Sequence, residues 1–165
     1  MKLFIIGMPG SGKSVVGRLL ARKLGRPFID LDGMVEKDAK MFIEEIFEKY
    51  GEQKFRALET EQLKKINAQD AIISCGGGIV KVKSNKDLMD GLTIYLDTDL
   101  DIIEERLKTD YQRPLLRTKS LANLYDERFL KYQDFADVII SNEKSVEETV
   151  DRILKYLEKE VESCA

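Results

Sequence analysis

A glycine-rich stretch directly after the first apolar run constrains the fold of this chain more than any other feature. Residues 7–14 read Gly-Met-Pro-Gly-Ser-Gly-Lys-Ser, the pattern G-x-x-x-x-G-K-[ST], and a segment of helical period follows. A turn of this kind between a strand and a helix lets successive backbone N–H groups point inward at an anion, and the helix adds its positive N-terminal end. Packing alone does not require Lys13 and Ser14 at those places, so we interpret the stretch as a phosphate-binding loop.

The individual residues of this loop have distinct expected roles. Lys13 would reach the β- and γ-phosphates of a nucleotide, and the hydroxyl of Ser14 would bind Mg²⁺ directly. Val15 stands where many such loops carry a hydroxyl residue, but its backbone amide remains available. We therefore predict ATP as co-substrate and Mg²⁺ as cofactor. The predicted ATP-binding residues of the loop are Gly10, Ser11, Gly12, Lys13, Ser14 and Val15.

Short apolar runs alternate along the chain with longer stretches of helical period. The runs lie at 3–6, 28–29, 71–73, 92–96 and 138–140. They are apolar almost throughout, which is typical of strands covered on both faces. Strand followed by helix, repeated, predicts an α/β fold with a parallel sheet and right-handed crossovers.

The composition narrows the class of protein further. The chain has 165 residues, which suits a single domain over 1–165, and 27 Lys and Arg against 30 Asp and Glu give a formal net charge of −3. This mild acidity provides no global field for nucleic acid, so we predict no nucleic-acid partner. The absence of His excludes Ser-His and Cys-His nucleophiles and His-ligated zinc or iron.

The distribution of apolar residues and of cysteine bears on location. No apolar run approaches the ~18–20 residues of a membrane span, and Gly7 interrupts the first run before a signal sequence could form. The 2 cysteines, Cys75 and Cys164, are too few for a Cys-only zinc site or a disulfide framework. We predict a cytoplasmic protein with no membrane partner, and we expect a monomer.

Two carboxylates follow the second strand. Asp30 and Asp32 stand two residues apart, and the period of a strand would place them on the same side of the chain, at the end where doubly wound sheets bind ligands. One could hold magnesium through water while the other accepts a hydroxyl proton. The alternative for either residue is a simple helix N-cap. The segment 30–33 also spells the D-x-x-G of GTPases, but no room remains for a switch segment and the base-reading N-K-x-D is absent, so we set that class aside.

Several motifs, taken together with the phosphate loop, resemble those of the shikimate kinases. In chain order they are Phe28-Ile29-Asp30-Leu31-Asp32, Gly51-Glu52-Gln53-Lys54-Phe55-Arg56-Ala57-Leu58-Glu59, Gly76-Gly77-Gly78, Arg113-Pro114-Leu115-Leu116 and Arg128. The phosphate loop is shared by a superfamily, whereas the combination of the other motifs is specific, and the likeness runs through nearly the whole chain. It implies a three-layer P-loop NTPase fold with a five-stranded parallel sheet in the order 2-3-1-4-5, helices on both faces and a lid.

The resemblance also implies an acceptor site. The segment from about 32 to 60 would bind shikimate and the lid would span about 108–120. Arg56 and Arg128 would hold the shikimate carboxylate, a task for which the planar guanidinium is suited. The amides of Gly77 and Gly78 would contact the same substrate.

The resemblance further implies the catalytic roles. Asp32 matches the carboxylate that meets the shikimate hydroxyl, and Asp30 the one nearer the water shell of Mg²⁺. Arg113 would close over the phosphates and neutralise charge during transfer, while Arg106 matches a position near adenine. The expected catalytic residues are thus Lys13, Asp32 and Arg113. The expected reaction, a step of aromatic amino acid biosynthesis, transfers the γ-phosphoryl of ATP to the 3-hydroxyl of shikimate and gives shikimate 3-phosphate.

Other interpretations of the same residues stay open at this point. A kinase of the same architecture could act on another small acid or nucleotide, such as gluconate or a nucleoside monophosphate. A regulatory module could hydrolyse ATP slowly to switch a partner. Arg128 could form a structural ion pair, for example with Glu59, and Arg113 could be a solvated cation in a polar loop.

Overall fold

A computed structural model of the chain describes residues 1–108 and 120–164. The strands are β1 (Lys2–Ile6), β2 (Phe28–Asp30), β3 (Ile72–Ser74), β4 (Gly91–Asp97) and β5 (Val138–Ser141). The helices are α1 (Lys13–Leu24), α2 (Leu31–Ala39), α3 (Ile43–Tyr50), α4 (Glu52–Lys65), α5 (Asn85–Leu88), α6 (Leu100–Leu107), α7 (Leu121–Phe135) and α8 (Val146–Cys164), with a 3-10 turn at Ile79–Lys81. None of these helices combines the length and the apolar character that crossing a membrane requires.

The five strands form one parallel sheet in the order β2-β3-β1-β4-β5. Strand β1 is central: its Ile5 lies opposite Ser74 of β3 and Ile94 of β4. The predicted fold class and strand order are confirmed. Because the order reverses at β1, the carboxyl ends of β1 and β3 flank the crevice where open α/β sheets bind ligands.

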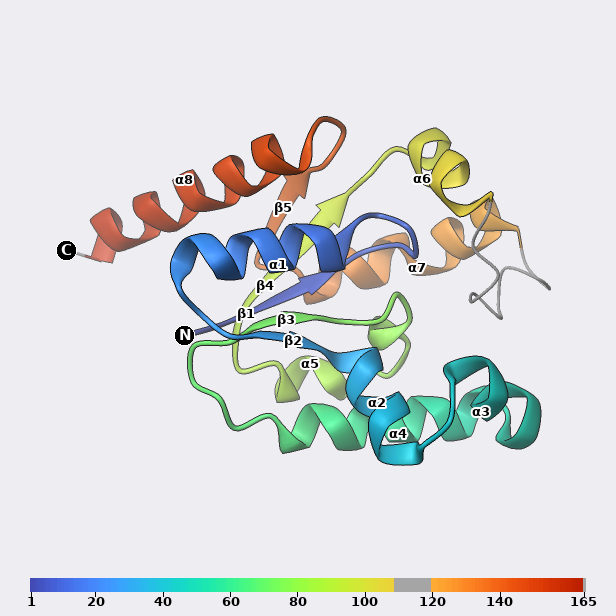
Figure 1. The fold of residues 1–165 in the computed structure, drawn as a ribbon. Helices are drawn as coiled ribbons and strands as arrows, with labels where there is room; N and C mark the ends of the chain where they lie inside the picture. Colours follow the sequence, from blue (N-terminus) through green and yellow to red (C-terminus); the bar gives the residue numbers. More distant parts are fainter. Residues whose placement is uncertain (109–119, 165) are drawn as a thin grey trace.

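Helices cover both faces of the sheet, as Figure 1 shows, with α1 and α8 on one face and α4, α5 and α7 on the other. The alternation of side chains along β1 explains the two layers. Leu3 and Ile5 pack with the apolar residues of α1 and α8, whereas Phe4 and Ile6 pack with those of α4 and α7. Each face of the central strand thus has its own core, as a strand buried on both sides requires.

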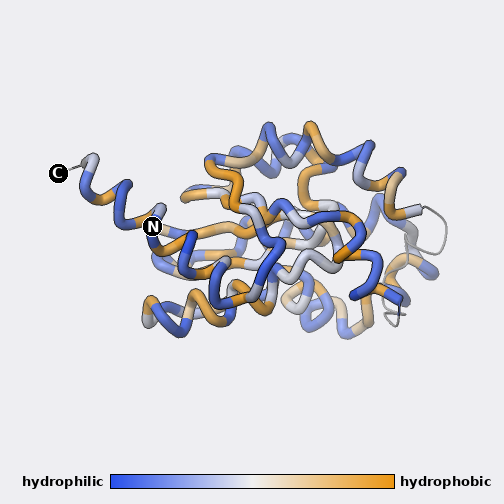
Figure 2. The backbone as a smooth tube through the Cα atoms, turned by 90° about the horizontal axis from the view of Figure 1, so that it is seen from above, coloured by the Kyte–Doolittle hydropathy of each residue, from blue (hydrophilic) through white to orange (hydrophobic). Residues whose placement is uncertain are grey.

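A third, smaller core lies away from the sheet. Val35 of α2, Ile46 of α3 and Phe55 of α4 are buried together and form a helical lobe beside the carboxyl ends of the strands. The C-terminal end of α8 is different, since its residues 158–163 are exposed. Figure 2 shows this mostly hydrophilic end projecting beyond the rest of the molecule.

The placement of Asp32 corrects one sequence argument. Strand β2 ends at Asp30, and Asp32 lies in the first turn of α2. The strand period therefore does not relate the two carboxylates. Asp30 occupies the N-cap position of α2, but its side chain makes no capping hydrogen bond. The negative charge of Asp32 instead lies at the positive N-terminal end of the helix, which favours it.

Candidate active site

The phosphate-binding loop connects β1 to α1 at the predicted place. Gly10 and Gly12 have φ angles of 80° and 89°, a left-handed conformation that side chains rarely adopt. Lys13 is buried, and its Nζ donates to the carbonyl oxygens of Gly7 and Met8, both at 2.9 Å. The loop thus curls around its own lysine, whose ammonium group is held by two backbone carbonyl oxygens.

Residues distant in sequence brace this loop from outside. Asn142, just after β5, is buried; its amide donates to the carbonyl of Ser11 and to Thr98 Oγ1, and its Oδ1 accepts from Thr149. Arg106 of α6 donates to the carbonyl of Gly10 at 3.2 Å. The bracing of Gly10 and Ser11 fixes the backbone whose N–H groups would hold phosphate.

A cavity of about 630 Å³ opens in front of the loop. The predicted residues that line it are Gly10, Gly12, Lys13, Ser14, Val15, Asp30, Asp32 and Arg106. Ser74, at the end of β3, also lines it, and the hydroxyls of Ser14 and Ser74 are 3.3 Å apart. Within the described residues no three His, Cys, Asp or Glu side chains gather as a metal cage. Hydroxyl and carboxylate oxygens around an open space suit Mg²⁺, which keeps several waters and uses one or two carboxylates plus phosphates.

The glycine triplet at 76–78 lies against charged side chains of α2 and α4. A Cβ on Gly76 would lie 2.6 Å from Asp32 Oδ1 and 2.8 Å from Glu59 Oε2, and a Cβ on Gly78 would overlap the guanidinium of Arg56. Only glycine allows these charged groups to approach the backbone so closely. The triplet therefore brings charged groups from α2 and α4 together behind the cavity.

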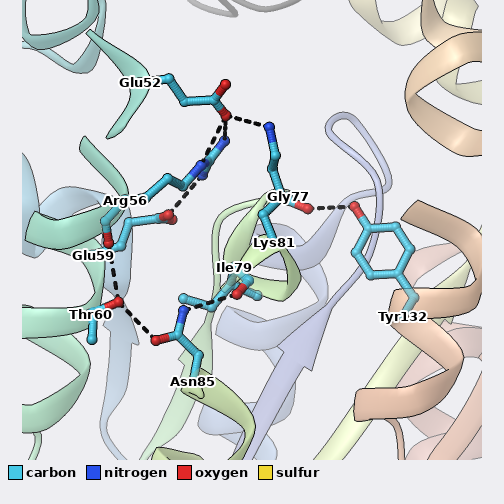
Figure 3. Close-up of polar contacts among 9 residues, drawn as sticks. All are labelled: Glu52, Arg56, Glu59, Thr60, Gly77, Ile79, Lys81, Asn85 and Tyr132. Atoms are coloured by element: carbon cyan, nitrogen blue, oxygen red, sulfur yellow. Dashed lines mark hydrogen bonds and ion pairs between the residues drawn. The ribbon is translucent and has the colours of Figure 1, made fainter. Parts of the chain in front are cut away.

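Arg56 is held on two sides, as Figure 3 shows. Its Nη1 donates to Glu59 Oε1 at 2.7 Å, while Nε and Nη2 donate to Glu52 Oε2 at 3.2 and 3.1 Å. Lys81 Nζ reaches the same Glu52 oxygen at 2.6 Å. Burial alone would lower the pKa of Arg56, but the two carboxylates hold it above its ordinary value. The guanidinium is therefore charged and fixed in orientation.

Glu59 is fully buried and joins several charged groups. Burial raises its pKa, against the lowering effects of Arg56, of a hydrogen bond with Asp32 and of the charge of Arg128. Glu59 therefore interacts electrostatically with Asp32 and with both arginines, Arg56 and Arg128. Cys75 lies beside them, and burial followed by the nearby carboxylates raises the pKa of its thiol, so it remains protonated and unreactive.

Arg128 of α7 is only 2% exposed, although it is one of the longest side chains in the protein. The alternative of a structural ion pair with Glu59 is not observed: Glu59 Oε1 pairs with Arg56, and Arg128 acts on Glu59 through its charge without a direct ion pair. Among the described residues, Nε and Nη2 of Arg128 have no hydrogen-bond partner. A buried guanidinium with unsatisfied donors is costly unless an anion completes it.

The structure does not bring every predicted residue to the cavity wall. Ser11 is buried within the loop. Of the predicted acceptor residues, the wall includes Asp32 but not Arg56, Gly77, Gly78 or Arg128, although Gly76 of the same triplet lines it. Arg113 lies outside the described residues. Helices α2 and α3 add wall residues that the sequence did not single out, namely Glu36, Phe42, Ile43, Glu44 and Glu45.

Sequence reasoning also missed four polar residues around the site: Glu52, Lys81, Tyr132 and Asn142. Glu52 belongs to a motif already quoted for its pattern, so its charge beside Arg56 was available as a signal. The other three act through contacts between segments far apart in sequence, and no local pattern marks them.

The fold and the phosphate loop together define a P-loop nucleotide-binding protein, and the comparisons with known proteins identify the family. A family model described as shikimate kinase matches residues 9–158. The chain is 42% identical over 161 residues to a shikimate kinase of Geobacter sulfurreducens, covering 93% of this chain and 88% of the relative. The chain belongs to the shikimate kinase family.

Solved structures agree with this assignment. A shikimate kinase from Acinetobacter baumannii in complex with shikimate superimposes with a TM-score of 0.92 at 30% identity, covering 96% of this chain and 93% of the other. A shikimate kinase from Aquifex aeolicus gives a TM-score of 0.83 at 38% identity, with 98% of each chain covered.

Proposed function

We propose that this chain transfers the γ-phosphoryl group of ATP to the 3-hydroxyl of shikimate, giving shikimate 3-phosphate and ADP. The observation that carries the proposal is that Asp32, which lines the phosphate-loop cavity, and the two buried arginines Arg56 and Arg128 all act on buried Glu59. Shikimate has one carboxylate and three hydroxyls, so its recognition needs fixed cations and a hydroxyl acceptor. The membership in the shikimate kinase family and the shikimate complex of the Acinetobacter baumannii relative support this substrate.

On the nucleotide side, the amides of residues 10–15 hold the β- and γ-phosphates and Lys13 neutralises their charge. Ser14 would hold Mg²⁺ directly and Asp30 would hold it through water; the ion would supply positive charge to the phosphates. Arg106 of α6 lies against the phosphate loop and contacts the nucleotide near the adenine. The hydrogen bond from Arg106 to Gly10 supports a role on this side of the cavity.

On the acceptor side, Arg56 and Arg128 hold the shikimate carboxylate, and Gly77 and Gly78 present amides to its oxygens. The unsatisfied donors of buried Arg128 support an incoming anion. Asp32 orients the 3-hydroxyl and takes its proton as the new P–O bond forms and the bond from γ-phosphorus to the bridging oxygen of ADP breaks.

Arg113 and the lid complete the proposal. Arg113 closes over the phosphates and stabilises charge in the transition state, as a lid residue in the segment from about 108 to 120. We also propose that the chain works as a single domain and a monomer in the cytoplasm, since its substrates are small and water-soluble.

A panel assay tests the reaction. ADP formation is followed with MgATP and, separately, shikimate, gluconate, a nucleoside monophosphate or no acceptor. We expect turnover with shikimate alone. Turnover with gluconate or the nucleotide would identify another small-molecule kinase, and ADP formation that does not depend on acceptor would identify a regulatory ATPase.

A further inference from the structure

Tyr132 is a buried residue of α7 that contacts the site from the side opposite Arg56. It lies four residues after Arg128 and is fully buried. Its hydroxyl donates to the carbonyl oxygen of Gly77 at 2.5 Å, as Figure 3 shows. Its ring stacks on Tyr95 with centroids 5.0 Å apart, and the hydroxyl lies 3.9 Å from Met8 Sδ. One side chain therefore joins the helix of Arg128, the glycine triplet and the phosphate loop.

Packing alone does not require the hydroxyl of Tyr132. Stacking on Tyr95 and filling the core would be achieved equally by phenylalanine, so the hydroxyl is the part that needs another explanation. Burial raises the pKa of Tyr132 to about 12, opposed by the charge of Arg128 and by a hydrogen bond between Arg128 and the Tyr132 hydroxyl. The hydroxyl therefore keeps its proton at neutral pH and acts as a donor to Gly77.

Fixing this carbonyl also fixes the direction of an amide. In a trans peptide the C=O and the following N–H point in opposite directions, and the described residues contain no cis peptide bond. With the Gly77 carbonyl directed at Tyr132, the N–H of Gly78 points away from α7. Arg56 lies on that other side (Figure 3), and its guanidinium occupies the space that a Cβ on Gly78 would need.

The amides of the triplet are available for a ligand. Among the backbone hydrogen bonds of the described residues, none has the N–H of Gly77 or Gly78 as its donor, whereas Ile79 and Lys81 donate to carbonyls of Gly76 and Gly78. Consecutive glycines rotate easily, because no side chain opposes a flip of the peptide between them. Without an external restraint, the direction of the Gly78 amide would vary.

We propose that Tyr132 is a positioning residue that locks the Gly77–Gly78 peptide so that the Gly78 amide faces the acceptor. The inference rests on the proposed function, because the acceptor is taken to be shikimate. It adds a determinant of acceptor affinity that lies outside the substrate contacts. Because Tyr132 also lies one helical turn from Arg128, the same side chain sets the distance between the carboxylate-binding arginine and the amide.

Two tyrosine variants separate positioning from packing. Tyr132→Phe removes the hydroxyl and keeps the ring, and Tyr95→Phe is the matched control, since Tyr95 is buried in the same stack but its hydroxyl bonds to Asp97. For Tyr132→Phe we expect the KM for shikimate to rise about 2- to 12-fold, the range of one neutral hydrogen bond, with the KM for ATP unchanged. For Tyr95→Phe we expect unchanged KM values for both substrates, whatever its effect on Tm. Equal KM values for shikimate in Tyr132→Phe and wild type would overturn the inference.

A measurement on the wild-type protein keeps the test decisive if Tyr132→Phe does not fold. In ¹⁵N-labelled protein, saturating shikimate should shift the amide resonance of Gly78 strongly and that of Lys81 little, because the Lys81 amide already donates to Gly78. An unshifted Gly78 resonance in an enzyme that does phosphorylate shikimate would refute the locking role alone. A wild-type protein that does not phosphorylate shikimate would instead refute the proposed function, and the inference with it.

Discussion

The phosphate side and the acceptor side of the site are built in opposite ways. The proposed phosphate side is built around one contiguous segment, residues 7–15, in which neutral backbone groups would supply most of the binding surface and Lys13 carries the charge. The proposed acceptor side draws charged side chains of α2 and α4 to the glycine triplet, and the charge of Arg128 of α7 acts on Glu59 in this group; Arg56 and Arg128 are both buried. Backbone amides bind an anion without a large desolvation penalty, whereas buried charges need partners before and after the ligand arrives.

This difference predicts how the two sides respond to substitution. Loss of a group from the phosphate loop removes an interaction with the nucleotide and leaves the acceptor side as it is. Loss of a charge from the acceptor side also leaves a buried partner unpaired, because Arg56, Glu59 and Glu52 satisfy one another. The variants below separate these effects, and each should change one side only.

The largest effect should follow Asp32→Asn, which removes the proton acceptor and keeps the shape of the side chain. We expect turnover to fall by roughly 10²- to 10⁴-fold, the usual contribution of a general base, with ATP binding retained. Steady-state kinetics and titration calorimetry with ATP measure the two quantities. Asp38→Asn, exposed at the far end of α2, is the control and should behave as wild type. A drop in nucleotide affinity equal to the drop in turnover would mean that Asp32 serves the phosphate side.

A somewhat smaller effect is expected for Lys13→Met on the phosphate side. Removing one fixed cation from the transferring group should lower kcat by about 10²- to 10³-fold. The affinity for shikimate, measured by calorimetry without nucleotide, should stay within twofold. Lys23→Met, an exposed lysine on the same helix, controls for loss of charge. A large loss of shikimate affinity would show that the two sides are not separate.

The next effect concerns the carboxylate-binding arginines. Arg56→Ala and Arg128→Ala should each lose a charge-assisted hydrogen bond of ~1.5–3 kcal/mol, or about 10- to 150-fold in shikimate affinity. ATP affinity should be unchanged, and exposed Lys131→Ala on α7 should change neither. Calorimetric titration of both ligands gives the comparison. If both arginine variants bind shikimate as tightly as the wild type does, these arginines do not bind the carboxylate of the acceptor.

The smallest effect should be one on stability, and it should be lost as the pH falls. Burial would raise the pKa of Glu52, but hydrogen bonds and charges from Lys81 and Arg56 outweigh burial and hold the pKa below its ordinary value of 4.5. A carboxyl whose pKa is lowered in the folded state stabilises the protein at pH values above its ordinary pKa. This stabilisation is lost as the pH falls through the folded-state pKa.

Glu52→Gln should therefore lower Tm at pH 7 by about 2–4 °C, corresponding to about 1 kcal/mol, and the difference from wild type should shrink as the pH falls below 4.5. Thermal unfolding at several pH values measures it. Glu61→Gln, exposed on the same helix, should show no such pH dependence. A difference that grows toward acid pH would contradict the lowered pKa.

The two sides also differ in how far the sequence predicts them. The phosphate loop, β1 and α1 follow from local chemistry, because glycine conformation, strand pattern and helix period all act over a few residues. The strand order came from the family resemblance. The positions of Arg56 and Arg128 on helices are predictable from the sequence, but their carboxylate partners are not. The sequence offers Glu59 as a partner of Arg128, whereas in the structure Glu59 pairs with Arg56.

The remaining misses arise from long-range contacts. Asn142 reaches Ser11 across 131 residues, and Tyr132 reaches Gly77 across 55. The sequence predicts that Asp32 continues a strand, but helix α2 begins at Leu31. The burial of Leu31 in the main core outweighs the low helix propensity of Gly33. In each case tertiary packing decides what neighbouring residues alone leave open.

The small core of Val35, Ile46 and Phe55 has a consequence for cooperativity. Free energies of local opening depend on how much apolar surface an opening exposes, and this core is much smaller than those against the sheet. Amide hydrogens of α3 should therefore exchange with solvent sooner than those of β1 and β4, whereas Leu31 connects α2 to a core against the sheet. Helix α4 belongs to both units, because Phe55 lies in the small core and Leu63 in a sheet core. Arg56 thus lies on the boundary between a slowly exchanging unit and a rapidly exchanging one.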